Sequence, residues 1–302
     1  MEIYNLIVTY NRSQMLEKVL NKLLEGGYKN IIVIDNASTD NTNKVLKKFI
    51  EKFPVTEFIK SDINLGGAGG FALAMRHFVK IADENSVAIL HDDDSWPAFK
   101  LDELKKNIPY ESRVLGCFPV LHPDGTLNSM NIPGEASFLK NPFLYLTMIL
   151  SGKKRRPSRL EEFKDFNNFD YCSFVGFAIS KSIITQHGVV SDKFFIYSDD
   201  TTYTYLISKL VGKIKIIGEG KLTFTHDCKR TTGKSLLNGK FAAYNIKNKI
   251  IFLRLSSSFS SFFIFLFVIQ SIVIAPSKTL IILRSSMEGI LTNKDEYGLI
   301  DV

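Results

Sequence analysis

Short apolar runs alternate with segments of helical periodicity along the first ninety residues of the chain. Apolar runs bounded by polar residues are typical of buried strands, and four occur, at residues 3–8, 31–34, 55–59 and 87–90. Apolar side chains three or four positions apart predict helices between them, over residues 14–24, 40–49 and 71–82. This alternation indicates an α/β fold with a mainly parallel, Rossmann-like sheet and helices on both faces.

The pattern becomes less regular in the middle of the chain and changes again near its end. Residues 114–177 mix β-like pieces with loops rich in Gly, Pro and Asn, which predicts a mixed sheet. Residues 262–275 are almost wholly apolar, Pro276 interrupts them, and residues 279–283 are apolar once more.

The apolar run of residues 262–275 is shorter than the roughly 20 residues that a membrane-spanning helix needs. We therefore predict a helical pair that packs on the domain or lies in a membrane interface, with a transmembrane span as the less favoured alternative. The chain then divides into a main domain over residues 1–240 and a C-terminal helical segment over residues 241–302. In the interfacial interpretation, this segment contacts the membrane.

The composition is that of a folded protein with an anionic partner. Hydrophobic residues make up 45% of the 302 residues, and the formal net charge is +7, which favours nucleotides, nucleic acid or lipid headgroups as partners. No strip of basic residues interleaved with aromatic ones is present, so we expect no nucleic acid. The three cysteines are widely spaced and the start lacks a signal-peptide pattern, which fits a reducing compartment.

A cluster of basic residues, 153–156 with Arg159, follows the apolar residues 143–150. Such an arrangement is typical of contact with an anionic membrane surface, and equally of a core segment followed by a solvated loop. The first interpretation places the protein in the cytoplasm, at the inner face of the cell membrane.

Three aspartates, Asp92, Asp93 and Asp94, follow the fourth predicted strand. Adjacent like charges need a compensating cation, and clustered carboxylate oxygens suit Mg²⁺ or Mn²⁺. The alternative is a solvated acidic turn that caps a helix beginning near Pro97.

Polar residues also follow the first two predicted strands, at 9–12 and 35–40. The carboxyl ends of parallel strands share one edge of a sheet, where open α/β sheets bind ligands. We expect Thr9, Arg12 and Asp35 to meet the aspartates there, although Asp35 and its neighbour also fit a simple Asx-turn.

The glycine-rich residues 64–70 lead into the helix that carries Arg76. Glycine lets the backbone approach a ligand closely, and a helix N-terminus favours phosphate. The alternative is a tight turn that allows close packing of the helix on the sheet.

Asp199 and Asp200 precede another helical segment, and His226 ends a β-like run. A second pair of carboxylates provides a candidate general base, whereas its alternative role is helix capping. A lone histidine is more often structural, but beside an acidic metal site it becomes a candidate ligand.

Jointly, these motifs resemble those of the family 2 glycosyltransferases of GT-A fold, over roughly residues 1–255. The loop at 64–71 and the tail segments 244–248 and 287–291 look most like the galactofuranosyltransferase and rhamnosyltransferase branch. The fold implied by this resemblance is the mixed, mainly parallel sheet described above.

The resemblance also implies a role for each residue of the motifs. The residues expected to bind the nucleotide sugar are Thr9, Arg12, Asp35, Asn64, Gly67, Arg76, Asp92 and Asp93. The residues expected to hold Mn²⁺ or Mg²⁺ against the diphosphate are Asp92, Asp94 and His226. Asp200 would deprotonate the acceptor hydroxyl, and we expect Trp96 and Asp199 to lie near the acceptor.

An inverting, metal-dependent glycosyltransferase is therefore the function implied. The donor expected is UDP-galactofuranose and the acceptor a surface polysaccharide or lipid-linked glycan, with a rhamnosyltransferase that uses dTDP-rhamnose as the alternative. A nucleotidyltransferase would need a glycine-rich, lysine-containing loop after the first strand, which residues 9–13 lack. A non-catalytic nucleotide- or glycan-binding module is the alternative of another class. Linkage, processivity and oligomeric state are left open by the sequence.

Overall fold

The computed structural model describes residues 1–52, 56–108, 113–136, 139, 141–143, 157–166, 168–230 and 233–302. The predicted membrane-contacting cluster at 153–156 and residues 144–150 before it lie outside these residues, so that prediction is not tested by the structure.

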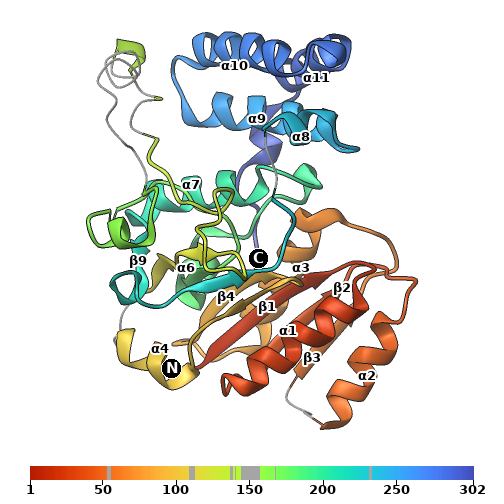
Figure 1. The fold of residues 1–302 in the computed structure, drawn as a ribbon, viewed down its shortest axis with the longest axis vertical. Helices are drawn as coiled ribbons and strands as arrows, with labels where there is room; N and C mark the ends of the chain where they lie inside the picture. Colours follow the sequence, from red (N-terminus) through yellow and green to blue (C-terminus); the bar gives the residue numbers. More distant parts are fainter. Residues whose placement is uncertain are drawn as a thin grey trace.

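A seven-stranded sheet forms the centre of the main domain, in the order β3-β2-β1-β4-β8-β6-β9 (Figure 1). Its strands are β1 (Ile3–Thr9), β2 (Asn30–Asp35), β3 (Thr56–Lys60), β4 (Val87–Asp92), β6 (Leu115–Cys117), β8 (Phe177–Ser180) and β9 (Lys215–Ile216). β8 pairs antiparallel with β4 and β6, whereas the other neighbouring strands pair in parallel. The predicted mixed, mainly parallel sheet is therefore confirmed.

Helices cover both faces of this sheet because its central strands are apolar on both sides. One face carries α1 (Ser13–Glu25), α2 (Thr42–Lys52) and α4 (Leu101–Asn107), and the other carries α3 (Gly66–Ile81), α6 (Lys181–His187) and α7 (Asp199–Val211). On β1, Ile7 packs into the first core and Leu6 into the second, and both are fully buried. Each such side chain stabilises the fold by about 1.5–3 kcal/mol.

The glycine-rich segment is part of helix α3 rather than a loop before it. α3 begins at Gly66, five residues earlier than the apolar periodicity predicts. A Cβ on Gly70 would lie 2.5 Å from Cγ1 of Val8, so glycine is what allows this first part of the helix to lie against β1.

The prediction of a helix near Pro97 is wrong. Residues Ser95–Pro97 form strand β5, and α4 begins only at Leu101. β5 pairs with β10 (Phe224–His226), which also pairs with β7 (Val120–Leu121) in a second sheet of three strands. This small sheet brings His226 back to the end of β4.

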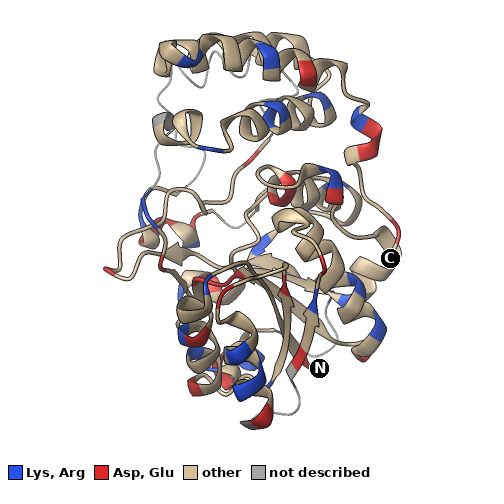
Figure 2. Ribbon diagram, turned by 90° about the vertical axis from the view of Figure 1, so that its right-hand side faces the viewer, with Lys and Arg blue, Asp and Glu red and all other residues tan. Residues whose placement is uncertain are grey.

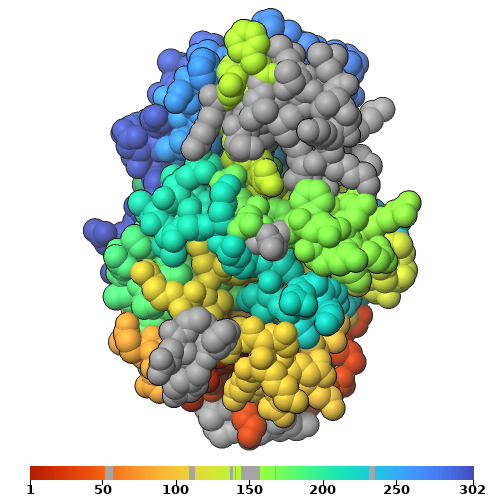
Figure 3. Space-filling model, turned by 90° about the vertical axis from the view of Figure 1, so that its left-hand side faces the viewer, coloured from red at the N-terminus to blue at the C-terminus, as the bar shows by residue number. Residues whose placement is uncertain are grey.

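The C-terminal helices lie at the opposite end of the molecule from α1 and α2 (Figures 1 and 3). They are α8 (Gly233–Asn238), α9 (Ala242–Ser256), α10 (Ser260–Ile274) and α11 (Thr279–Leu291). They share a third core, in which Ile246 and Ile250 of α9 pack with Phe263 and Ile282. The last residues return to the main domain, where Ile300 pairs with Val189.

Helices α10 and α11 are the pair that the apolar runs predict, and the short helix at Pro276–Lys278 separates them. Among the described residues no single helix is long and apolar enough to cross a membrane. Ser260–Ile274 and Pro276–Leu291 meet the length and hydropathy requirements together, but they are bent by 115°.

Candidate active site

The registers of the central strands place the polar motifs at one edge of the sheet. Thr9 lies opposite Asp35 where β1 and β2 end, and Val8 lies opposite Asp92 on β4. The antiparallel pairing of β10 with β5 puts His226 opposite Ser95, directly after the three aspartates. The clusters predicted from strand order therefore meet in space.

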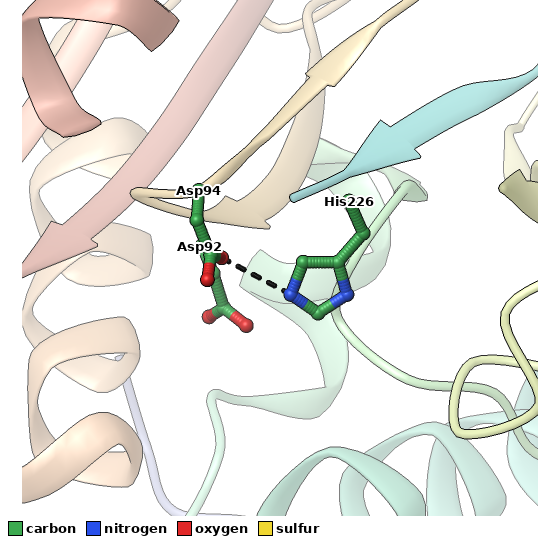
Figure 4. A group of neighbouring side chains, drawn as sticks. All are labelled: Asp92, Asp94 and His226. Atoms are coloured by element: carbon green, nitrogen blue, oxygen red, sulfur yellow. Dashed lines mark ion pairs between the residues drawn. The ribbon is translucent and has the colours of Figure 1, made fainter. Parts of the chain in front are cut away.

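Asp92, Asp94 and His226 form a group in which one ligand atom from each residue lies within 4.8 Å of the others (Figure 4). His226 Nε2 lies 3.0 Å from Asp94 Oδ1. Two carboxylates and one imidazole are a donor set that suits a divalent cation, and the imidazole favours Mn²⁺ over Mg²⁺. The three residues therefore fit a metal ion by chemistry and by separation.

The protons on this group oppose metal binding at low pH. Burial raises the pKa of Asp92 to about 7, and the neighbouring Asp94 charge adds to that effect. Burial alone would lower the pKa of His226, but its hydrogen bonds to Asp94 and Cys228 and the charges of Asp92 and Asp94 together outweigh burial and raise the pKa to about 10. A divalent cation bound here competes with both protons, so its affinity falls as the pH falls.

Two asparagines lie beside Nδ1 of His226, and sequence reasoning did not find them. Asn131 Oδ1 lies 2.9 Å from Nδ1 of the imidazole, and Asn128 Nδ2 lies 3.4 Å from the same atom. An Nδ1–H that donates to Asn131 leaves Nε2 as the lone-pair nitrogen, which is the tautomer a metal requires. Both asparagines come from the irregular middle of the chain, where no periodicity marks them.

Asp93 points to a different set of partners from its neighbours. It accepts a hydrogen bond from Thr9 Oγ1 at 2.7 Å and one from Arg12 at 2.9 Å. Arg12 also donates to Asp94 at 2.8 Å, and its side chain is 44% exposed. Asp93 thus holds Thr9 and Arg12 beside the metal group and leaves an accessible guanidinium there.

Asp35 is fully buried and has one carboxylate oxygen without a partner. Its Oδ1 accepts from the backbone N–H of Ser38 at 2.9 Å, whereas Oδ2 has no hydrogen bond among the described residues. An unsatisfied buried acceptor at the ligand edge of a sheet fits a donor supplied by a ligand.

The start of α3 is fixed to the end of β2 by a pair of amides. Asn36 Nδ2 donates to Asn64 Oδ1 at 3.0 Å, and Asn64 Oδ1 also accepts from the N–H of Gly66. The side chain of Asn64 is therefore used in holding the start of α3. Gly67, one residue further along α3 than Gly66, lines the cavity described below.

Asp199 and Asp200 form the first turn of α7 and follow a segment of unusual backbone geometry. Phe195, Tyr197 and Ser198 have φ values of 62°, 68° and 63°. Each residue in this conformation costs about 1–3 kcal/mol, and the conformation persists only where the surrounding structure enforces it. Such strain is concentrated at functional sites. Burial raises the pKa of Asp200, although hydrogen bonds from Thr201 act in the opposite direction.

A cavity of about 770 Å³ connects these groups. Asp92, His226, Asp199 and Asp200 line it from the main domain. Its opposite wall is formed by C-terminal helices, with the side chains Leu236, Leu237, Asn245, Lys249, Phe267, Gln270, Ser271 and Ile274. The cavity thus lies between the sheet edge and the C-terminal segment.

Of the predicted residues, Gly67, Asp92, Asp199, Asp200 and His226 line the cavity, whereas Thr9, Arg12, Asp35, Asn64, Asp93 and Asp94 lie at the sheet edge without lining it. Arg76 and Trp96 do not line it either. Arg76 lies ten residues after the start of α3, and its guanidinium contacts the carbonyl of Asp301 at 3.4 Å. Ten helical residues span about 15 Å, so a pyrophosphate at the start of α3 is out of reach of Arg76. Trp96 is buried in the core, and the ammonium of Lys18 lies 4.8 Å from its ring centre, so it does not line the cavity.

The chain belongs to glycosyl transferase family 2, which it matches over residues 6–188. It is 44% identical over 46 residues to the UDP-N-acetylglucosamine–dolichyl-phosphate N-acetylglucosaminyltransferase of Methanococcus voltae, covering 15% of this chain and 18% of that protein. It is 30% identical over 108 residues to the poly-beta-1,6-N-acetyl-D-glucosamine synthase of Staphylococcus epidermidis, covering 34% and 25%. The chain thus spans only about a fifth to a quarter of the length of these relatives.

The fold is the GT-A fold of known glycosyltransferase structures. GalNAc-T7 with UDP, GalNAc and Mn²⁺ superposes with a TM-score of 0.63 at 12% identity, over 98% of this chain and 56% of that one. A mannosyltransferase from Pyrobaculum calidifontis in complex with GDP-Man and Mn²⁺ superposes with a TM-score of 0.53 at 14% identity, over 96% and 74%.

Proposed function

We propose that this protein is an inverting, metal-dependent glycosyltransferase that transfers a sugar from a nucleoside-diphosphate sugar to a hydroxyl of a glycan or lipid-linked glycan. The observation that carries the proposal is that Asp92 and His226 of the metal-ligand group and a separate, partly buried carboxylate, Asp200, line one cavity. Membership of glycosyl transferase family 2 supports the class, and the two superposed structures contain a nucleotide or nucleotide sugar with Mn²⁺.

On the donor side, Asp92, Asp94 and His226 would hold the metal, which neutralises charge that develops on the departing diphosphate. The unpartnered oxygen of Asp35 would accept a hydrogen bond from the nucleoside. Arg12, held by Asp93, presents its guanidinium to the phosphates.

On the acceptor side, Asp200 takes the proton of the attacking hydroxyl. The acceptor oxygen forms a bond to the anomeric carbon, the bond from that carbon to the diphosphate oxygen breaks, and the proton passes to the carboxylate. A base separate from the metal group leaves the opposite face of the sugar open to attack, which gives inversion. Asp199, whose pKa burial and the charge of Asp200 raise well above its ordinary value, stands beside the base as an acceptor contact.

For the donor we propose UDP-galactofuranose, on the basis of the sequence motifs at 64–71 and 244–248. Purified protein with Mn²⁺ and a lipid-linked acceptor should release UDP with this donor and form a product of inverted configuration. If the protein turns over only dTDP-rhamnose, the galactofuranose assignment is wrong and the protein is a rhamnosyltransferase. UDP binding without turnover on any nucleotide sugar would favour a non-catalytic binding module.

We also propose that helices α10 and α11 lie on the inner face of the cell membrane. Exposed apolar side chains follow one another along both helices, with Phe265 at 62%, Val273 at 74%, Leu280 at 81% and Leu291 at 77% exposure. Figure 2 shows few charged residues on this outermost pair of helices. Arg284 stands among the apolar residues of α11, as in helices that bind anionic lipid surfaces.

The two sides of α10 support a lipid-linked acceptor. Phe265, Ile269 and Val273 face outward, whereas Phe267 and Ser271 line the cavity on another side of the same helix. An acceptor anchored in the membrane against α10 would therefore have its glycan close to the cavity. The Methanococcus voltae relative, named for a dolichyl-phosphate acceptor, supports an acceptor of this class.

Replacing Leu280 and Leu291 together by glutamate should weaken binding to vesicles that contain anionic lipid by about tenfold or more, because each exposed leucine would otherwise contribute free energy on entering the apolar layer. Co-sedimentation with vesicles measures this, and Leu210→Glu, a change at an exposed leucine of α7 outside this helix pair, is the control. If the wild-type protein does not bind vesicles but dimerises through Leu280 and Leu291, a second copy of the chain covers the exposed apolar side of α10 and α11.

A further inference from the structure

Asn248 of helix α9 is fully buried, and its side-chain amide contacts the segment that leads into Asp199 and Asp200. Nδ2 lies 2.9 Å from the carbonyl oxygen of Phe194, 2.8 Å from that of Ile196 and 3.1 Å from that of Tyr197. Three carbonyl acceptors around one nitrogen require the NH₂ group at that position, so the orientation of the amide is fixed by its partners.

The segment that Asn248 contacts is the one with left-handed backbone geometry. Phe195, Tyr197 and Ser198 are not glycines, and bulky residues rarely adopt positive φ. The carbonyl groups of Phe194, Ile196 and Tyr197 lie around Nδ2 of Asn248, whose two N–H donors are shared among these three acceptors. Asn248 thereby compensates the strained conformation.

The same segment is held from the other side by the start of α3. The backbone N–H of Ala68 donates to the carbonyl of Phe195 at 3.2 Å. A Cβ on Gly66 would lie 2.1 Å from that oxygen, so only glycine allows this approach. The segment is thus held between the start of α3 and helix α9.

We propose that Asn248 is a positioning residue for the base: it fixes the 194–198 segment and so places Asp200 for proton transfer. Asn248 does not line the cavity, whereas its neighbours Asn245 and Lys249 do, so it acts through the segment and not on the substrate. This inference rests on the proposed function, since it takes Asp200 as the base.

Asn248→Ala should lower kcat by about 100-fold, because displacement of a catalytic group by about 1 Å costs that much. The KM for the donor and the affinity for UDP with Mn²⁺ should stay unchanged, because the donor-side groups do not contact Asn248. Asn248→Ser, which keeps a single donor, should have an intermediate kcat and covers the case in which the alanine variant does not fold. Ser256→Ala is the matched control, since its buried hydroxyl on α9 has no hydrogen-bond partner among the described residues.

A double-mutant cycle with Asp200→Asn distinguishes positioning from a general structural role. If Asn248 acts through Asp200, adding Asn248→Ala to the Asp200→Asn variant should cause no further loss of kcat. A further loss of the same factor in the double variant, or a parallel loss of UDP affinity in Asn248→Ala, would overturn the inference. Full activity of Asp200→Asn alone would instead refute the proposed base, so the two failures are separable.

Discussion

Asparagine in place of Asp200 is expected to lower kcat for glycosyl transfer about 10³-fold, within the range that a general base contributes. The amide has the shape of the carboxyl group but cannot accept a proton at neutral pH. Binding of UDP and Mn²⁺, measured by calorimetry, should be unchanged because the metal group comes from other residues.

The pH dependence of kcat/KM provides a second readout for Asp200. Because burial raises the pKa of this carboxyl group, activity should fall as the pH drops through a value above that of an ordinary aspartate. At Mn²⁺ concentrations that keep the metal group occupied over the pH range, the residual activity of Asp200→Asn should lack this dependence. The control is Asp102→Asn, a change at an exposed residue in the first turn of α4, which should retain both the rate and the pH profile. Transfer at the wild-type rate by Asp200→Asn would contradict the assignment of Asp200 as the base.

Asparagine in place of Asp94 should weaken metal-dependent UDP binding by more than about 100-fold, since loss of even an indirect contact to a metal ligand costs 10–100-fold in metal affinity. Asp94 forms ion pairs with both His226 and Arg12. Its charge therefore holds the imidazole and the guanidinium in place beside the metal-ligand group. Calorimetric titration of UDP with and without Mn²⁺ measures the effect.

A chelator provides the matching control for the metal site. It should weaken UDP binding to the wild-type protein and have no effect on the Asp94→Asn variant, which has already lost the metal contribution. Wild-type affinity for UDP that is insensitive to both chelator and Mn²⁺ would show that the acidic group serves another purpose.

The donor side of the site could be predicted from the sequence because it depends on local patterns. Each of Thr9, Asp35 and Asp92 ends an apolar strand, and parallel strands bring their ends together. The grouping of Asp92, Asp94 and His226 followed from the resemblance, and the structure brings these three together. Their roles in binding and catalysis remain predictions.

The contacts to His226 and to the 194–198 segment could not be predicted in the same way because they join residues that are distant in sequence. Asn131 and Asn128 reach His226 from about a hundred residues earlier, and Asn248 reaches the 194–198 segment from about fifty residues later. Single asparagines carry no periodic signal, so only the assembled fold reveals them. Trp96 was expected near the acceptor, but it is buried in the core beside Lys18.

The order in which the chain is synthesised bears on when activity arises. Metal ligands, nucleotide-side residues and Asp200 all precede residue 227, whereas the opposite wall of the cavity and the amide of Asn248 come from the helices made last. Since domains begin to fold from the N-terminus as the chain emerges, the growing protein would assemble its donor site well before its acceptor wall. A growing chain that has emerged from the ribosome as far as residue 240 should therefore bind UDP and yet transfer no sugar, which ties the onset of catalysis to the emergence of α9 and α10.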